Sequence, residues 1–258
     1  MTETKQPFDL IKRGSSARSP LGTATFIILR ALDGFWLQHH LLQTPNLLLS
    51  HLPILPPTLP APTGLSSPLP SLSPSLTPYQ SVLWAMSLAA ALKQIIWITH
   101  IAREPVYPTT SALIASYNTL LNTLNTIFFA YSASNPTWTP TTLTLAIPLF
   151  TTGLLLELVS ELQRKSFKDR PETAGKPYVG GLFAYARSVN YFGYMLWRAG
   201  FALAGGGWVW GALVAGLLAW DFGARAVPAL DAYCAKRYGV QWDEVRRKVP
   251  WAFCPGVW

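Results

Sequence analysis

The stretch AGFALAGGGWVWGALVAGLLAW, residues 199–220, decides the fold class because it contains no Asp, Glu, Lys or Arg. A helix needs about 20 mostly apolar residues to cross the hydrocarbon core of a bilayer. Residues 34–92 and 105–156 are equally free of acidic and basic side chains, and only 12% of the chain is charged against 50% hydrophobic. A soluble enzyme normally carries about twice that charge density. The sequence therefore predicts an all-α protein, a polytopic bundle of membrane-spanning helices.

Six segments approach the length and apolar character of a transmembrane helix, at 21–42, 80–102, 111–132, 141–162, 190–204 and 207–227. The first is weak and the fifth is short, so re-entrant or interfacial placement of these segments stays open. The first two are separated by a proline-rich loop, residues 53–78, for which an irregular or polyproline-like connection is expected. We divide the chain into an N-terminal segment (1–20), an N-terminal transmembrane region (21–156) and a C-terminal region (157–258). Within the last region, residues 230–248 are expected to form a cytoplasmic helical tail that is broken at Gly239.

The basic residues fall on one side of the six predicted spans. With the N-terminus in the cytoplasm, the cytoplasmic segments 1–20, 103–110, 163–189 and 228–258 carry four, one, six and five Lys or Arg residues. The loops on the opposite side, 43–79, 133–140 and 205–206, carry none. Positive residues collect in short cytoplasmic loops, so both termini are predicted to be cytoplasmic. The net charge of +8 is then explained by cations that flank the membrane, and no nucleic-acid partner is expected.

Several ionisable side chains lie inside the predicted spans, where such groups normally need a partner or a wet cavity. Arg30 and Asp33 are three residues apart and can pair on one helical face, which favours structural neutralisation over catalysis. Lys93 is too far from the end of its span to reach the interface, so either an internal partner or a cavity is expected. Glu157 and Glu161 are four residues apart and share a face, either to bind a ligand or to cap the basic loop that follows.

The last predicted span and the tail have features of packing and anchoring. Gly207, Gly211 and Gly216 remove side-chain bulk at roughly helical spacing, so close approach of a neighbouring helix is expected there. The basic run at 246–248 precedes an apolar, aromatic end. This tail is expected either to lie on the membrane surface or to close over a ligand.

The chain lacks the signatures of soluble enzymes. It contains no Gly-x-Gly-x-x-Gly that opens a helix after a strand, no P-loop and no Gly-x-Ser-x-Gly elbow. The histidines do not have a metal-ligand spacing, and Cys234 and Cys254 supply neither a disulfide framework nor a zinc site, so no metal is expected. Residues 157–200 instead combine carboxylates, cations, glycines and aromatic residues at a predicted membrane boundary, which suits an anionic ligand.

Three motifs in the C-terminal region carry a family resemblance: Gly180-Gly181-Leu182-Phe183-Ala184-Tyr185, Asn190-Tyr191-Phe192-Gly193 and Gly200-Phe201-Ala202-Leu203-Ala204. The tail adds YCAKRYGVQW at 233–242 and Val-Pro-Trp at 249–251, which look like the Lys-Tyr-Gly-x-x-Trp and Val-Pro-aromatic endings of sterol reductases. Residues 157–258 thus resemble the membrane-embedded steroid 5-alpha-reductases and sterol reductases, together with related proteins that share this DUF1295-like domain. The Asn-Tyr-x-Gly motif by itself also occurs in isoprenylcysteine methyltransferases.

The resemblance implies a membrane reductase of the endoplasmic reticulum that uses NADPH to reduce a carbon–carbon double bond of a sterol-like or other lipid substrate. The cofactor would lie between the last helices and the cytoplasmic segments. Guanidinium and ammonium groups bind phosphate, and the phosphate candidates are Arg164, Lys165, Lys168 and Arg187. Further cofactor contacts to ribose, nicotinamide and the rings are expected from Glu157, Glu161, Asn190, Tyr191, Tyr233 and Tyr238.

The chain also departs from the family pattern. Many relatives carry a His-Pro pair before the Asn-Tyr motif, a glutamate after its glycine, and a histidine four residues before the tail tyrosine. Here those places are taken by Ser188, Val189, Tyr194 and Ala229. The departures affect the proton relay more than the cofactor pocket, so no catalytic residue is assigned, and Asp33 and Tyr117 are guesses for polarising a carbonyl. Two alternatives stay open, an S-adenosylmethionine-dependent lipid or prenyl methyltransferase and a lipid-binding relative without catalysis.

Overall fold

The computed structural model describes residues 19–44, 71–132, 135–139 and 141–258. Every regular element in these ranges is helical, which confirms the predicted all-α fold. In chain order the elements are α1 (Pro20–Ala31), η1 (Leu32–Leu37), α2 (Gln38–Gln43), α4 (Pro78–Ile96), η2 (Trp97–Ile101), α5 (Pro108–Ala130), α6 (Thr142–Lys168), η4 (Pro171–Thr173), η5 (Gly181–Ala184), α7 (Val189–Asp221), η6 (Phe222–Ala226), α8 (Val227–Tyr238) and α9 (Val240–Lys248). Each predicted span corresponds to helix, whereas most of the N-terminal segment and of the proline-rich loop lies outside the described residues.

Prolines and a capping box fix where several helices begin. Pro20, Pro78 and Pro108 occupy the first turns of α1, α4 and α5, where a missing backbone N–H costs no helical hydrogen bond. At the start of α4, Thr77 Oγ1 accepts the Gln80 backbone N–H at 3.3 Å, and Gln80 Oε1 accepts the Thr77 N–H at 2.8 Å. These three helices therefore begin one to three residues ahead of the predicted spans, at 20, 78 and 108 and not at 21, 80 and 111.

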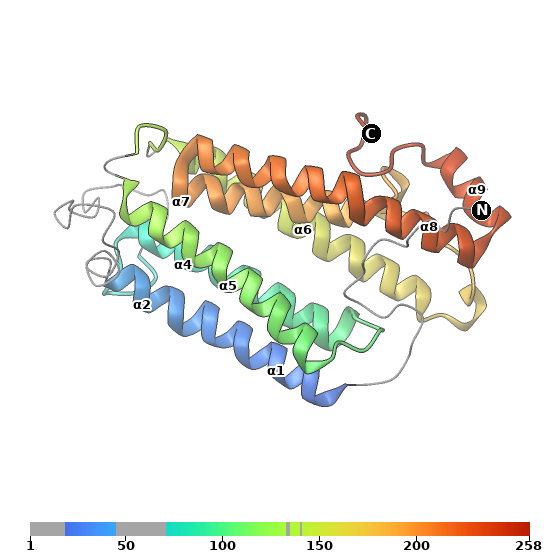
Figure 1. The fold of residues 1–258 in the computed structure, drawn as a ribbon, viewed down its shortest axis with the longest axis horizontal. Helices are drawn as coiled ribbons and strands as arrows, with labels where there is room; N and C mark the ends of the chain where they lie inside the picture. Colours follow the sequence, from blue (N-terminus) through green and yellow to red (C-terminus); the bar gives the residue numbers. More distant parts are fainter. Residues whose placement is uncertain (1–18, 45–70, 133–134, 140) are drawn as a thin grey trace, which may run out of the picture.

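Helix α7 consists of two limbs that reverse at Gly207. The backbone of Gly207 has φ 76° and ψ −169°, a conformation that is readily open only to glycine. After the reversal, the Trp208 N–H donates to the Thr137 carbonyl at 3.1 Å. At the far end of the limbs, the Tyr191 ring stacks at 5.1 Å on that of Phe222, the first residue of η6, and Figure 1 shows the two limbs side by side. The reversal lies where the sequence predicts the turn between the last two spans.

Glycines allow α6 to pack directly against the first limb of α7. A Cβ added at Gly153 would lie 2.3 Å from the backbone nitrogen of Trp197, and one at Gly193 would lie 2.6 Å from the backbone nitrogen of Glu157. No side chain fits at these distances, so the two helix backbones approach as closely as small residues permit. This contact brings the carboxylates of α6 beside the polar residues of α7.

The predicted glycine stripe of the last span is only partly a packing surface. Gly211 faces Leu203 of the first limb, where an added Cβ would lie 3.1 Å from the leucine Cβ. Gly207 serves the reversal itself. The prediction for Gly216 is wrong, because no atom of the described chain beyond the adjacent residues and the helix's own backbone lies within 4 Å of a Cβ built there.

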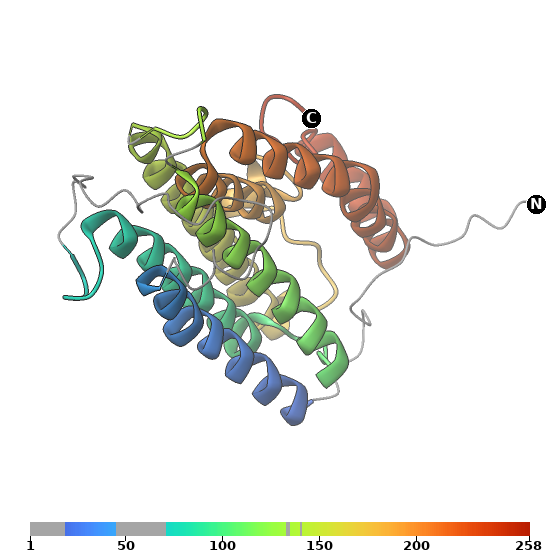
Figure 2. The ribbon, with the colours of Figure 1, turned by 60° about the vertical axis from the view of Figure 1, so that its left-hand side comes forward.

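The helices form two groups. Figures 1 and 2 show α1, α2, α4 and α5 on one side of the molecule, α6 and both limbs of α7 on the other, and α8 with α9 at one end. An aromatic cluster ties the groups together near the α7 reversal, where Tyr79 stacks on Phe129 at 5.0 Å. The Tyr79 hydroxyl and the Trp138 indole N–H both donate to the Ala204 carbonyl, at 3.0 and 3.1 Å.

Three helical segments of the described chain are long and apolar enough to cross a membrane, at 78–101, 142–168 and 189–238. These segments support an integral membrane protein. The number of crossings and the cytoplasmic placement of the termini remain predictions.

The tail confirms the predicted break at Gly239, which has φ 55° between α8 and α9. The first helix of this tail, α8, continues from α7 through the π-helical segment η6. Beyond α9 the chain folds back over α7, and the Phe253 ring packs edge-on against Phe192 and Phe222 at 5.8 and 5.9 Å.

Candidate functional site

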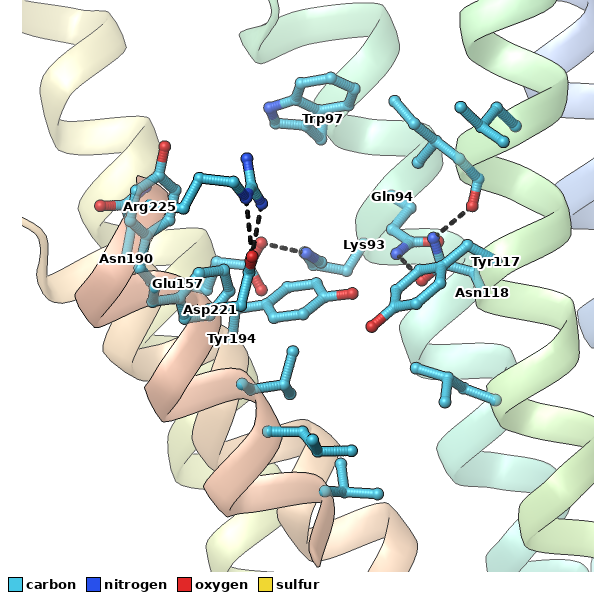
Figure 3. Close-up of a pocket in the computed structure, with 18 of the residues that line it drawn as sticks. Lys93, Gln94, Trp97, Tyr117, Asn118, Glu157, Asn190, Tyr194, Asp221 and Arg225 are labelled. Atoms are coloured by element: carbon cyan, nitrogen blue, oxygen red, sulfur yellow. Dashed lines mark hydrogen bonds and ion pairs between the residues drawn. The ribbon is translucent and has the colours of Figure 1, made fainter. Parts of the chain in front are cut away.

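A cavity of about 720 Å³ lies between the two groups of helices. Its walls come from α1, α4, η2, α5, α6, η6 and both limbs of α7, and most of the wall surface is apolar. Figure 3 shows that the polar groups lie on opposite sides, with Lys93 and Tyr194 between them. The polar and ionisable lining residues are Lys93, Gln94, Tyr117, Asn118, Glu157, Glu161, Asn190, Tyr191, Tyr194, Asp221 and Arg225.

Glu161 and Asn190 form the buried acceptor-rich corner of the cavity. Asn190 Nδ2 donates to Glu161 Oε1 at 2.7 Å, while Arg164 donates to Glu161 Oε2 at 2.5 Å. A carboxylate accepts hydrogen bonds, so its contact fixes which end of the Asn190 amide is nitrogen. Asn190 Oδ1 is buried and has no hydrogen-bond partner among the described residues. Such an atom is suited to receive an N–H or O–H from a ligand.

Lys93 finds an internal partner, as its position in the sequence requires. Its ammonium group bonds Glu157 Oε1, and Glu157 Oε2 accepts the Trp197 indole N–H at 2.7 Å. The same ammonium lies 5.8 Å from the centre of the Tyr194 ring and 5.5 Å from that of Trp197. Both alternatives considered for Lys93 therefore apply, because it is paired and also lines a cavity.

A second ion pair lies where α7 meets η6. Arg225 donates from Nε and Nη2 to the two carboxylate oxygens of Asp221, at 2.7 and 2.6 Å. The π-helical turn of η6 places both Phe222 and Arg225 on the cavity wall. Such local π segments are common at functional sites.

On the opposite wall, amide side chains connect the cavity to a buried guanidinium group. Gln94 Nε2 donates to Asn118 Oδ1 at 2.6 Å, and the same oxygen accepts from Arg198 Nη2. Arg198 also donates to Asn122 Oδ1 at 3.0 Å and to the Tyr194 hydroxyl at 3.2 Å. Arg198 does not line the cavity itself but lies directly behind two residues that do.

Four of the predicted cofactor residues, Glu157, Glu161, Asn190 and Tyr191, line the cavity together. The remaining six, all described by the structure, lie outside the lining. Arg164 is bound to Glu161, Lys165 to Asp169, and Lys168 to the Lys176 carbonyl and the Tyr238 hydroxyl. Tyr233 accepts from Arg237 at 2.6 Å. These positions give no support to a phosphate-binding cluster on the cavity wall, and a cofactor role for them remains a prediction.

Arg187 is occupied by the C-terminal tail. Its guanidinium donates to the carbonyls of Val249 and Pro250 at 2.7 and 3.0 Å and lies 3.7 Å from Asp231. Burial lowers the pKa of Arg187, and the nearby Asp231 opposes that effect. The structure thus shows Arg187 fastening the tail to the start of α7.

Sequence reasoning missed Arg198 and the amide pair Gln94 and Asn118. Arg198 carried an available signal, because it lies inside the predicted span 190–204, and an ionisable residue within a span marks a functional candidate. Of the two guesses for carbonyl polarisation, Tyr117 lines the cavity. Asp33 does not, since it is buried against Arg30 at 2.6 Å, as the predicted pairing requires.

The cavity opens between α5 and the second limb of α7. Lining residues there are strongly exposed, with Leu113 at 56%, Leu217 at 57% and Trp220 at 71% of their surface. Farther along, the helices close on each other, because the Trp210 indole N–H donates to Asn125 at 2.7 Å. The opening is therefore flanked by apolar side chains of α5 and of the second limb of α7.

Comparison with known proteins identifies the family. A family model described as "Protein of unknown function (DUF1295)" matches residues 113–246. The chain is similar to the probable O-methyltransferase ustE of Ustilaginoidea virens, with 36% identity over 241 residues that cover 89% of this chain and 84% of the relative. It is also similar to the protein-S-isoprenylcysteine O-methyltransferase of Schizosaccharomyces pombe, with 30% identity over 70 residues, or 27% of this chain and 29% of that protein. The match to the family model covers more than half of the sequence, and the chain belongs to the DUF1295 family.

Proposed function

We propose that the protein is an S-adenosylmethionine-dependent O-methyltransferase that acts on a lipid-soluble acceptor within the membrane. The observation that carries the proposal is that both cations of the described cavity lining, Lys93 and Arg225, are already bound to carboxylates. A dinucleotide phosphate needs available guanidinium or ammonium groups. S-adenosylmethionine has no phosphate, and its single carboxylate is accompanied by an ammonium and a sulfonium cation, so it demands fewer available cations. The methyltransferase names of the two relatives support the same choice.

The acceptor-rich side of the cavity fits the polar groups of S-adenosylmethionine. The unpaired Asn190 Oδ1 suits an ammonium or amino hydrogen, and Glu161 beside it suits a ribose hydroxyl or the ammonium charge. Asp221 adds a third acceptor on the second limb of α7. Tyr191, stacked on Phe222, supplies an aromatic surface for the adenine ring.

Bound S-adenosylmethionine supplies an electrophilic methyl group on sulfur. The protein must hold the acceptor oxygen in line with that group, exclude water and take up any proton that the acceptor releases. Trp97, Val214 and Leu218 contribute apolar wall surface that helps to exclude water. Glu157, held by Lys93 and Trp197, is the carboxylate that we assign to proton uptake.

The exposed opening between α5 and α7 suits an acceptor that arrives from the lipid phase. Its flanking residues belong to apolar helices, so a hydrophobic molecule can enter without crossing water. Residence in the endoplasmic reticulum with cytoplasmic termini accords with the resemblance of the C-terminal region and remains a prediction.

Equilibrium binding to the whole chain in lipid nanodiscs tests the proposal. We expect saturable binding of S-adenosylmethionine and transfer of its radiolabelled methyl group to a lipid-extractable product. Replacing Asn190 with Ala should weaken S-adenosylmethionine binding, because the unpaired acceptor is lost, while Arg187→Ala should leave it unchanged. The expected NADPH-linked reductase is the second candidate, favoured by the motifs at 180–204 and 233–251. Saturable NADPH binding without S-adenosylmethionine binding would restore it.

A further inference from the structure

Arg198 is a buried cation without a carboxylate partner among the described residues. Only 1% of its surface is exposed. Its hydrogen bonds go to the amide oxygens of Asn118 and Asn122 and to the Tyr194 hydroxyl, which are all neutral groups. A charge buried in this way is costly unless an opposite charge compensates it.

The Trp197 ring, 4.3 Å from the Arg198 guanidinium, provides a cation–π contact, but the surrounding network supplies no full opposite charge. Asn122 connects Arg198 to Asp33 through a hydrogen bond of 2.8 Å, but Asp33 is already paired with Arg30. Two guanidinium groups therefore share one carboxylate, which leaves one net positive charge in the cluster. The Nε and Nη2 atoms of Arg30 are buried without partners among the described residues, so the cluster also lacks acceptors.

Tyr194 lies between this positive charge and the cavity. Arginine only donates hydrogen bonds, so the Tyr194 oxygen accepts from Arg198, and the hydroxyl hydrogen stays available for another partner. The Tyr194 ring is held between Trp197 at 5.1 Å and Phe222 at 5.8 Å. Figure 3 shows the ring between the two polar sides of the cavity, with its hydroxyl toward Tyr117 and Asn118. This is the position where the sequence departs from the glutamate of the reductase pattern.

We infer that Tyr194, backed by Arg198, binds an oxyanion at the α4–α5 side of the cavity, and that the methyl acceptor is a lipid-soluble molecule with an acidic oxygen. A phenol, an enol or a carboxylic acid presents such an oxygen. The identification of this oxyanion as the acceptor rests on the proposed function, whereas the oxyanion site itself does not. Tyr194 touches the acceptor, and Arg198 is a positioning residue that acts through Tyr194.

The charges of the two sides complement each other. A sulfonium cation on the acceptor-rich side would face an oxygen anion on the Arg198 side. In the transfer, the bond between the acceptor oxygen and the methyl carbon forms, the sulfur–methyl bond breaks, and both charges are neutralised. A phenol or enol first loses its proton to Glu157, while a carboxylate needs no such step.

A lipophilic 4-nitrophenol with a dodecyl chain is a suitable probe, because its phenolate absorbs visible light and reports ionisation directly. Bound to the parent protein in nanodiscs, the probe should titrate about one pH unit lower than in empty nanodiscs, which equals a tenfold preference for the anion. Tyr194→Phe keeps the ring but removes the donor and should abolish most of this preference. Arg198→Met should abolish it as well, and Arg198→Lys should retain part of it. The control Tyr107→Phe changes a tyrosine outside the cavity lining and should behave like the parent.

The inference would be overturned if the probe titrated in the parent protein as it does in empty nanodiscs. It would also be overturned if the probe titrated in Tyr194→Phe as it does in the parent. Tyr194→Phe keeps the test decisive even when Arg198→Met does not fold. Competition identifies the source of the oxyanion: displacement of the probe by dodecanoate shows that carboxylates are accepted, and its absence restricts the site to phenolates and enolates. Equal displacement by dodecanol would contradict an oxyanion site. Binding of S-adenosylmethionine, measured on the same samples, separates failure of the proposed function from failure of the oxyanion site.

Discussion

Glu161 and Lys165 lie one turn apart on α6, yet only Glu161 faces the cavity. Glu161 accepts the amide of Asn190 at 2.7 Å, whereas Lys165 is partly exposed and pairs with Asp169. The two residues therefore form a matched pair for testing which part of α6 binds the cofactor.

Glu161→Gln should weaken S-adenosylmethionine binding by roughly tenfold or more, because hydrogen bonds to charged groups contribute about 1.5–3 kcal/mol. Isothermal titration calorimetry in nanodiscs measures the change. Lys165→Gln, on the same helix, should bind S-adenosylmethionine like the parent. Equal losses in both variants would show that α6 affects the cofactor only through overall stability, and a selective loss of NADPH binding in Lys165→Gln would revive the predicted phosphate role.

The reversal of α7 should depend on Gly207 and not on Gly216. Alanine at Gly207 must adopt φ 76° and places its Cβ 2.5 Å from the Thr137 carbonyl oxygen. We expect a loss of stability of about 1–3 kcal/mol, the usual cost of one strained backbone position. Gly216→Ala meets open space and should be neutral or stabilising by up to about 1 kcal/mol. Thermal unfolding in a single detergent compares the two variants, and similar melting temperatures would contradict the hairpin geometry.

The sequence predicts the helices well because their signals are local. Runs of apolar residues set the lengths, prolines mark the starts, and the glycines at 205–207 mark the reversal. The pairing of Lys93 was also predictable in outline, because a buried ammonium requires a partner. Its identity was not, since Glu157 is 64 residues away and reaches Lys93 only through the packing of α4 beside α6.

The cofactor residues were harder to predict, because charge alone does not show which way a side chain points. The basic residues in the last turns of α6 and just before α7 suggested a phosphate site. In the structure, Arg187 donates to a carbonyl of the C-terminal tail. Lys168 donates to the loop that follows α6 and to the Tyr238 hydroxyl. Conversely, Arg198 lies inside an apolar span and was not singled out from the sequence, although tertiary packing makes it the charge behind the cavity.

Arg187→Ala should release the tail and leave the cavity lining unchanged. In the parent, burial raises the pKa of the Cys254 thiol, so little reactive thiolate is present at mildly alkaline pH. Without the Arg187 contacts to Val249 and Pro250, the thiol should become more exposed, its pKa should fall toward the ordinary value, and its alkylation should accelerate several-fold. Iodoacetamide labelling followed by mass spectrometry in a Cys234→Ser background measures the rate. An unchanged rate would mean that the aromatic contacts and the backbone hydrogen bond from residue 187 to the Trp251 carbonyl suffice to hold the tail.

The Lys93–Glu157 pair should show strong energetic coupling. Removing one partner of a buried ion pair costs about 3–5 kcal/mol, because the other charge is left uncompensated. Lys93→Met and Glu157→Gln should each destabilise the protein by that order, and the double variant should lose less than the sum. Glutamine at 157 keeps an oxygen for the Trp197 indole N–H, so the cycle isolates the ion pair. Additive effects would indicate that the two side chains do not interact in the membrane.

The opening between α5 and α7 should control how acceptors reach the cavity. Leu113 and Leu120 lie on the same helix and are equally exposed, at 56% and 57%, but only Leu113 belongs to the cavity lining. Tryptophan at Leu113 adds bulk at the mouth and should lower kcat/KM for long-chain acceptors by roughly tenfold, while S-adenosylmethionine binding stays unchanged. That size corresponds to about 1.4 kcal/mol of lost transition-state binding. Leu120→Trp presents the same bulk to the surroundings away from the mouth and should leave both quantities unchanged. Methyl transfer measured with acceptors of increasing chain length distinguishes the variants, and equal rates for Leu113→Trp and Leu120→Trp would place the entrance elsewhere.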